Sequence, residues 1–113
     1  MPAVPYYAAL LGAILLGVLG QVALKAGAER SSGMVGQFLD PFTIGGFAVY
    51  ALAAILYIIA IKRIPISLAF PSVSLSYVAV AIIAHLLWGE PLGVPQVAGI
   101  ALIAGGILLL HQT

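Results

Sequence analysis

The sequence contains no cysteine and very little charge. Without cysteine it has no disulfide framework, iron–sulfur site or thiol chemistry. Only 6% of the 113 residues are charged and 64% are hydrophobic, whereas a soluble domain carries about a quarter charged residues. Four basic and three acidic side chains cannot keep such a chain in water, so we expect the bilayer to be its solvent. The net charge of +1 gives no indication of a nucleic-acid partner.

Acidic side chains are also missing from the apolar parts of the sequence. Glu29, Asp40 and Glu90 all lie in polar segments between the apolar stretches. A carboxylate inside the membrane is the usual proton carrier of a coupled transporter, and this sequence lacks one. Paired carboxylates, an H-E-x-x-H metal motif and a Walker loop are absent as well, so we expect no enzyme activity, no metal site and no cofactor.

Four long apolar stretches make up most of the sequence. They predict an all-α membrane protein, one domain over residues 1–113, with helices at about 6–26, 42–61, 66–88 and 94–110. A transmembrane helix needs about 20 residues. A barrel strand is about half as long and alternates with period 2, which these stretches do not. Four spans place both termini on one side of the membrane.

The orientation of the predicted bundle does not follow from its basic residues. Lys25 and Arg30 lie on one side of the membrane, and Lys62 and Arg63 lie on the side of the termini. Because the two sides are equal, the positive-inside rule does not choose between them. Either a weak bias decides the orientation, or the chain inserts both ways or follows a partner.

Polar and small residues mark one face of the first helix. Ala9, Ala13, Gly17, Gln21 and Lys25 follow one another at intervals of four, so they share a face. Small residues at this spacing allow close helix packing. The Gln21 amide needs a partner, either a neighbouring helix or a wet cavity. Lys25 either extends to the interface or provides a positive charge suited to a phosphate at a cavity mouth.

The third helix carries most of the hydroxyl groups. Pro71 lacks the N–H of a helix interior and predicts a kink. One face holds, at three- and four-residue spacing, Phe70, Ser74, Tyr77, Ala81 and His85. On this spacing Ser74 and Tyr77 are predicted to line a cavity, whereas Ser72 and Ser76 are expected to make ordinary interhelical hydrogen bonds.

The second and fourth helices differ in character. Tyr50 lies deep in the second helix and needs a partner for its hydroxyl, whereas Tyr57 can be a packing residue. The fourth helix has no polar side chain between Val97 and Leu110. Its small residues predict close packing in a dimer. They are Ala101, Gly105 and Gly106.

Several motifs together resemble the drug/metabolite transporter superfamily. The run from Pro65 to Tyr77, the turn Gly89-Glu90-Pro91 and the glycine-containing last helix resemble an EamA half-unit, and the four-helix length resembles the small multidrug resistance branch. Gly20-Gln21 followed by Lys25, with Ala-Phe-Pro and Ser-Leu in the third helix, is most similar to small flippase subunits that move aminoarabinose linked to undecaprenyl phosphate.

The resemblance also shows a departure that bears on mechanism. Gly17 stands where small multidrug exporters have a glutamate that binds proton and cation, and Val73 stands where they have a tryptophan, while Tyr50 matches their tyrosine. The resemblance therefore implies a transporter in the bacterial or archaeal inner membrane that flips a lipid-linked sugar, with the lipid tail remaining in the bilayer. The alternatives are a transporter of a small, hydrophobic molecule or drug, and an accessory subunit without its own transport path.

Partners and site residues complete this set of expectations. A homodimer, or a heterodimer with a similar four-helix subunit, is expected, with membrane lipid as the surroundings. Lys25 is expected to attract the phosphate of the substrate. The residues expected to hydrogen-bond the sugar are Gln21, Tyr50, Ser74 and Tyr77.

Overall fold

The computed structural model describes residues 4–112 and, over that part of the chain, consists of helices and their connections. The helices are α1 (Val4–Arg30), α2 (Met34–Leu39), α3 (Pro41–Ala60), α4 (Ile66–Val73), α5 (Leu75–Trp88) and α6 (Val94–Leu110). Three segments are long and apolar enough to cross a membrane: α1, α3 and the α4–α5 pair; α6 is apolar but shorter. The predicted all-helical class is confirmed.

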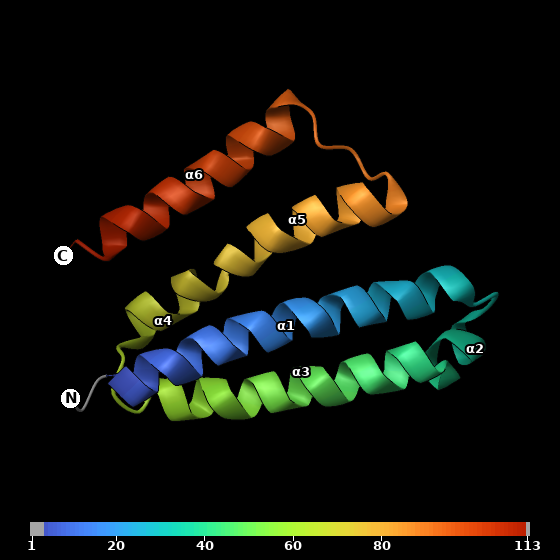
Figure 1. The fold of residues 1–113 in the computed structure, drawn as a ribbon, viewed down its shortest axis with the longest axis horizontal. Helices are drawn as coiled ribbons and strands as arrows, with labels where there is room; N and C mark the ends of the chain where they lie inside the picture. Colours follow the sequence, from blue (N-terminus) through green and yellow to red (C-terminus); the bar gives the residue numbers. More distant parts are fainter. Residues whose placement is uncertain (1–3, 113) are drawn as a thin grey trace.

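The helix bounds differ from the expected ones mainly at the end of α1. This helix continues to Arg30, one turn beyond residue 26, so Lys25 lies within it. The start of α3 has the signals seen in the sequence: Pro41 is its first residue, and Asp40 Oδ1 accepts a hydrogen bond from the Phe42 N–H at 2.9 Å. Both ends of the described chain lie at one end of the molecule (Figure 1).

Helices α1 and α3 form a closely packed hairpin because glycines face each other at their contact. A Cβ added to Gly46 would lie 2.9 Å from the Ala23 Cβ and 3.0 Å from the Gly20 carbonyl oxygen. A Cβ added to Gly20 would meet the Gly46 carbonyl oxygen at 3.1 Å. Small residues are the usual means by which membrane helices approach so closely.

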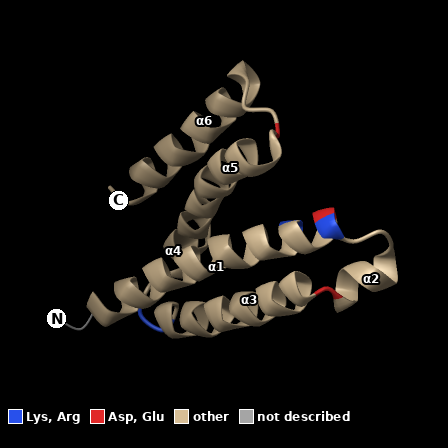
Figure 2. Ribbon diagram, turned by 45° about the vertical axis from the view of Figure 1, so that its right-hand side comes forward, with Lys and Arg blue, Asp and Glu red and all other residues tan. Residues whose placement is uncertain are grey.

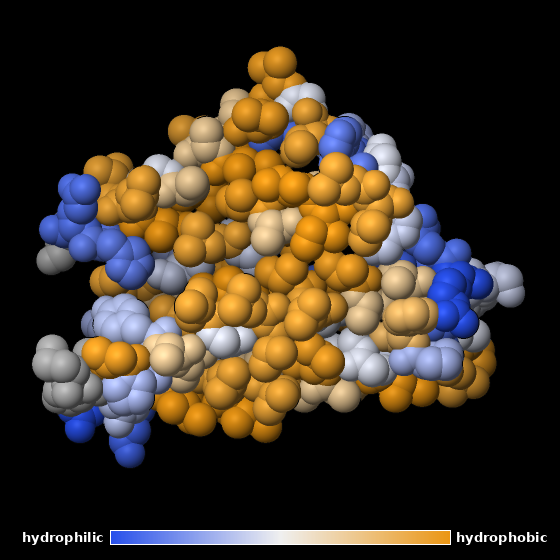
Figure 3. All heavy atoms as spheres, in the orientation of Figure 1, coloured by the Kyte–Doolittle hydropathy of each residue, from blue (hydrophilic) through white to orange (hydrophobic). Residues whose placement is uncertain are grey.

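The helices lie side by side in the order α3, α1, α4–α5, α6, so that α3 and α6 form the two edges (Figure 1). Helix α6 packs on the α4–α5 segment. A Cβ added to Gly105 or Gly106 would meet nothing within 4 Å. The surface is apolar across the middle and polar at the two ends (Figure 3), as expected for a chain surrounded by lipid.

The third predicted span is interrupted after Pro71. Helix α4 ends at Val73 and α5 begins at Leu75. At the break the Ser74 N–H donates to the Pro71 carbonyl at 2.9 Å, and the Tyr77 N–H donates to the Ser74 carbonyl at 3.0 Å. Both bonds join residues three apart, which tightens the chain to about three residues per turn.

One side-chain hydrogen bond ties the end of α6 to α4. His111 Nε2 lies 2.8 Å from Ser72 Oγ. The Ser72 hydroxyl donates its proton to the Leu68 carbonyl at 2.7 Å, so the imidazole N–H must donate to Ser72.

Replacing His111 with alanine is expected to loosen the last turn of α6. The lost bond contributes about 1 kcal/mol, so amide exchange at residues 107–110 should accelerate about fivefold. Gln112→Ala changes the neighbouring exposed residue and is the control. Equal exchange rates in the two variants would show that the bond does not hold α6.

Candidate functional site

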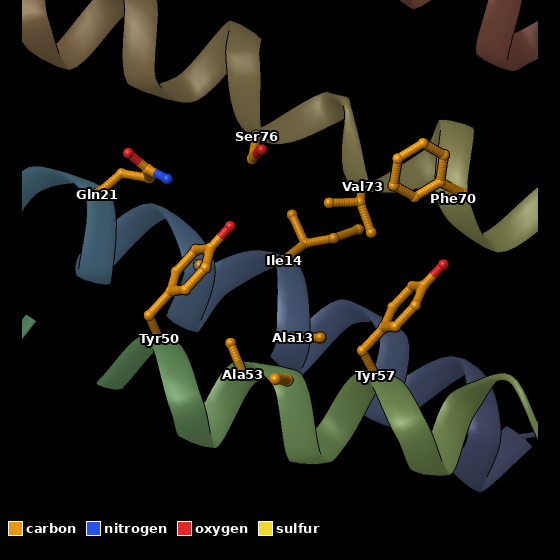
Figure 4. A pocket seen from close by; sticks show the side chains of 11 residues that line it. Ala13, Ile14, Gln21, Tyr50, Ala53, Tyr57, Phe70, Val73 and Ser76 are labelled. Atoms are coloured by element: carbon orange, nitrogen blue, oxygen red, sulfur yellow. The ribbon is translucent and has the colours of Figure 1, made fainter. Parts of the chain in front are cut away.

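A cavity of about 230 Å³ lies between the α1–α3 hairpin and the α4–α5 segment. Figure 4 shows its lining side chains. They are Ala13, Ile14, Gly17, Gln21, Tyr50, Ala53, Ala54, Tyr57, Phe70, Val73 and Ser76. None of these lining residues is charged, and four carry a side chain that forms hydrogen bonds, so the cavity suits a neutral polar group against apolar walls.

Two tyrosines on α3 provide hydroxyl groups to the cavity. Tyr50 and Tyr57 are two turns apart, so they share a face of the helix, and both rings point from α3 toward the cavity (Figure 4). The Tyr57 hydroxyl is buried and has no hydrogen-bond partner within residues 4–112. An unpaired buried hydroxyl is costly, so the Tyr57 hydroxyl is an unused hydrogen-bonding group in the wall of the cavity.

Helix α1 contributes a stripe of small residues and one amide. Ala13, Gly17 and Gln21, which the sequence placed on one face, all line the cavity. A Cβ added to Gly17 would meet nothing within 4 Å. Position 17 is therefore an open part of the cavity wall, and Gln21 is one turn further along.

The break between α4 and α5 decides which residues of the third span reach the cavity. The residues of this span that line the cavity are Phe70, Val73 and Ser76. They follow one another at intervals of three, the same interval that separates the donor and acceptor residues of the hydrogen bonds at the break. A regular α-helix would instead have placed Phe70 on a face with Ser74 and Tyr77.

Ser74 and Tyr77 lie elsewhere in the structure. The Ser74 hydroxyl donates to the Pro71 carbonyl one turn back. Tyr77 is 64% exposed and lies in a shallow groove between α5 and α6, near Gln96. Neither lines the cavity, and their role in substrate binding stays a prediction.

Lys25 lies one turn beyond Gln21, at the end of the molecule away from the termini. Its Nζ is 3.2 Å from Glu90 Oε2 and 4.0 Å from Glu29 Oε2. Gln21 and Tyr50 are thus the two predicted site residues that the structure brings together around the cavity, while Lys25 is close to it and ion-paired.

The sequence predicts other roles for two residues of the cavity. Tyr57 is expected to be a packing residue, and Ser76 is expected to make an ordinary interhelical hydrogen bond. The seven-residue interval between Tyr50 and Tyr57 is a signal that could have found the first, because residues two turns apart share a face. Ser76 could be found only once the change of period at the break was known.

The fold and the cavity define a helical membrane protein with an uncharged, hydrogen-bonding pocket between a helix hairpin and a broken helix. Comparison with known families gives the particular class. The model of the EamA-like transporter family matches residues 2–112, and the chain belongs to that family.

Curated relatives share one description. A protein of Pseudomonas fluorescens (strain Pf0-1) is 34% identical over 109 residues, covering 91% of this chain and 94% of the relative. A protein of Escherichia fergusonii is 35% identical over 68 residues, covering 60% of this chain and 61% of the relative. Each is described as a probable 4-amino-4-deoxy-L-arabinose-phosphoundecaprenol flippase subunit, ArnE. No solved structure matches the chain significantly.

Proposed function

We propose that this chain is a subunit of a flippase that moves a polyprenyl-phosphate-linked amino sugar across the bacterial inner membrane. The observation that carries the proposal is the similarity to the Pseudomonas relative, which covers 91% of this chain. The cavity supports it, because its lining has hydroxyl and amide groups and no charge. The sugar would hydrogen-bond to Gln21, Tyr50 and Tyr57, and the polyprenyl tail would stay in the lipid.

The size and charge of the cavity favour this function over export of cationic drugs. Its volume of about 230 Å³ is below the range of about 300–1,000 Å³ typical of pockets for drug-sized ligands, but a single sugar ring is smaller than such ligands. The open wall at Gly17 has no carboxylate to hold a cation or a proton. Without that group, the gradient of the substrate itself would set the direction of flipping.

The active unit is proposed to be a dimer of four-span subunits, either identical or similar. Helix α6 would be the fourth span, although its 17 residues reach only about 25 Å at 1.5 Å per residue. It lies at an edge of the molecule (Figure 1), and its glycines face open space. A second subunit packing on Ala101, Gly105 and Gly106 would cover that edge by the small-residue contact common in membranes.

The proposal is tested by reconstitution in liposomes that contain an amino-sugar-linked polyprenyl phosphate. A membrane-impermeant, amine-reactive reagent then measures how much of the lipid reaches the outer leaflet. Gln21→Leu is expected to slow flipping about 3- to 10-fold, the effect of one lost hydrogen bond to a ligand. Gln37→Leu, the same change on α2 outside the cavity, should leave the rate unchanged.

The outcomes separate the alternatives. No flipping by this chain, alone or with a similar four-helix subunit, would favour an accessory role. Normal lipid flipping in Lys25→Ala together with loss of a soluble solute's transport would favour a small-molecule transporter and reject the flippase.

A further inference from the structure

An ion pair joins α1 to the connection between α5 and α6. Lys25 Nζ and Glu90 Oε2 are 3.2 Å apart. Lys25 belongs to α1, and Glu90 lies just after α5, so the pair links the hairpin half of the molecule to the other half at the end away from the termini (Figure 2). The second partner of Lys25, Glu29, is on α1 itself and makes no such link.

The backbone holds Glu90 in place for this contact. Gly89 ends α5 in the left-handed conformation, with φ of 67°, which glycine adopts without strain. The Glu90 N–H donates to the Ala84 carbonyl at 3.4 Å, and His85 Nδ1 lies 2.8 Å from the Glu90 carbonyl oxygen. The carboxylate is therefore presented by an ordered turn.

The position of Lys25 makes it the cation that a phosphate at the cavity would meet. It is one turn, or about 6 Å along the axis, beyond Gln21, which lines the cavity. The cavity lining itself has no charge to balance a phosphate. The other nearby cation, Arg30, is 3.4 Å from Asp40 on the α3 side. In the present arrangement Glu90 occupies the place beside Lys25 that a phosphate would need.

The two other cations of the chain are not held in this way. Lys62 and Arg63 belong to the connection between α3 and α4, which lies at the opposite end of the molecule (Figure 1). Within residues 4–112 no carboxylate is in ion-pair contact with either. All three acidic residues of the chain are thus at the Lys25 end, where they neutralise its cations. This arrangement distinguishes Lys25 from a cation that is simply exposed.

We propose that Glu90 is a positioning residue that competes with the phosphate of the lipid substrate for Lys25. The inference rests on the proposed flippase function. When the phosphate binds Lys25, Glu90 is released to water and the link between α1 and the α5–α6 connection opens; when the phosphate leaves, Glu90 returns. Lys25 keeps an anionic partner throughout. Both side chains are partly exposed, at 41% and 44%, and such pairs are weak enough to exchange.

The test measures the opening of this end directly. Because the chain has no cysteine, Ser32→Cys and Leu92→Cys introduce a unique pair of spin labels on the two sides of the link. The full chain is reconstituted in phosphatidylcholine vesicles, and the label separation is measured with polyprenyl phosphate, with neutral polyprenol and with inorganic phosphate. We expect polyprenyl phosphate alone to increase the separation.

Three variants of the labelled chain distinguish the effect of the Lys25–Glu90 ion pair from the effect of removing a charge at this end of the molecule. Glu90→Gln should show the larger separation without any probe and bind polyprenyl phosphate about 2- to 5-fold more tightly, the effect of removing one exposed competing charge. Glu29→Gln removes the same charge without the link and should keep the wild-type separation. Lys25→Gln should be open without probe and lose the preference for polyprenyl phosphate over polyprenol.

Each contrary result has a distinct meaning. If polyprenyl phosphate binds preferentially but the separation stays constant, or if Glu90→Gln binds it no more tightly, the exchange is overturned while the flippase proposal stands. If the wild-type chain binds polyprenol and polyprenyl phosphate alike, the proposed function itself is contradicted. An equal opening with inorganic phosphate would overturn the assignment to a lipid.

Discussion

Replacing Gly46 with leucine is expected to lower the free energy of unfolding by about 2–3 kcal/mol, the upper part of the range for overpacking substitutions. The Cβ alone would lie 2.9 Å from the Ala23 Cβ, 3.0 Å from the Gly20 carbonyl oxygen and 3.0 Å from the Leu24 nitrogen. Two of these atoms are backbone, so rotation of a side chain cannot relieve the contact. Helices α1 and α3 must separate, which also displaces Tyr50 from the cavity.

Gly45→Leu is the matched control for this prediction. It makes the same change at the adjacent residue of α3, where a Cβ would meet nothing within 4 Å. Both variants are compared with the wild type by detergent-induced unfolding in micelles, followed by circular dichroism. Equal stability of Gly46→Leu and Gly45→Leu would show that the two helices do not pack as closely as the structure has them.

Replacing Tyr57 with phenylalanine is expected to change stability and transport in opposite directions. Removing a buried hydroxyl that has no partner should raise the free energy of unfolding by about 1 kcal/mol. The same change removes a hydrogen bond to the sugar and should slow flipping about 3- to 10-fold. Unfolding in micelles and the liposome assay measure the two effects.

Tyr7→Phe is the control for Tyr57→Phe. Tyr7 is an exposed residue of α1 outside the cavity lining, so neither stability nor flipping should change beyond about 0.5 kcal/mol. A loss of stability in Tyr57→Phe would mean that its hydroxyl has a structural partner. An unchanged flipping rate would remove Tyr57 from the proposed binding site.

The helix hairpin shows how far sequence reasoning reached. The spacing of Ala13, Gly17 and Gln21 was enough to place them on one face of α1, and the structure puts all three on the cavity wall. An α-helix has one period, so a regular span needs no further information. Close packing of small residues was also predictable, but their particular partners, such as Gly46 beside Gly20, were not.

In the third span, the residues that line the cavity differ from those expected from the sequence. At three- and four-residue spacing, Ser74 and Tyr77 share a helix face with Phe70, and for that reason the sequence predicts that they line the cavity. Pro71 did indicate an irregularity, but not its geometry. At the break, the backbone hydrogen bonds of the Ser74 and Tyr77 N–H groups join residues three apart instead of four. As a result, Val73 and Ser76 lie on the helix face that lines the cavity. A change of period over one turn redirects every side chain that follows.

The sequence by itself determined that this protein consists of apolar helices embedded in the membrane. It also determined that the few charged residues lie near the helix ends and that position 17 has no acidic side chain. Composition and helical period decide these properties, and both are local. Only the tertiary structure decided that Ser76 lines the same cavity as Tyr50 and Tyr57 and that Glu90 pairs with Lys25. Those residues are far apart in the chain, and they meet only because the α1–α3 hairpin and the broken α4–α5 segment pack against each other.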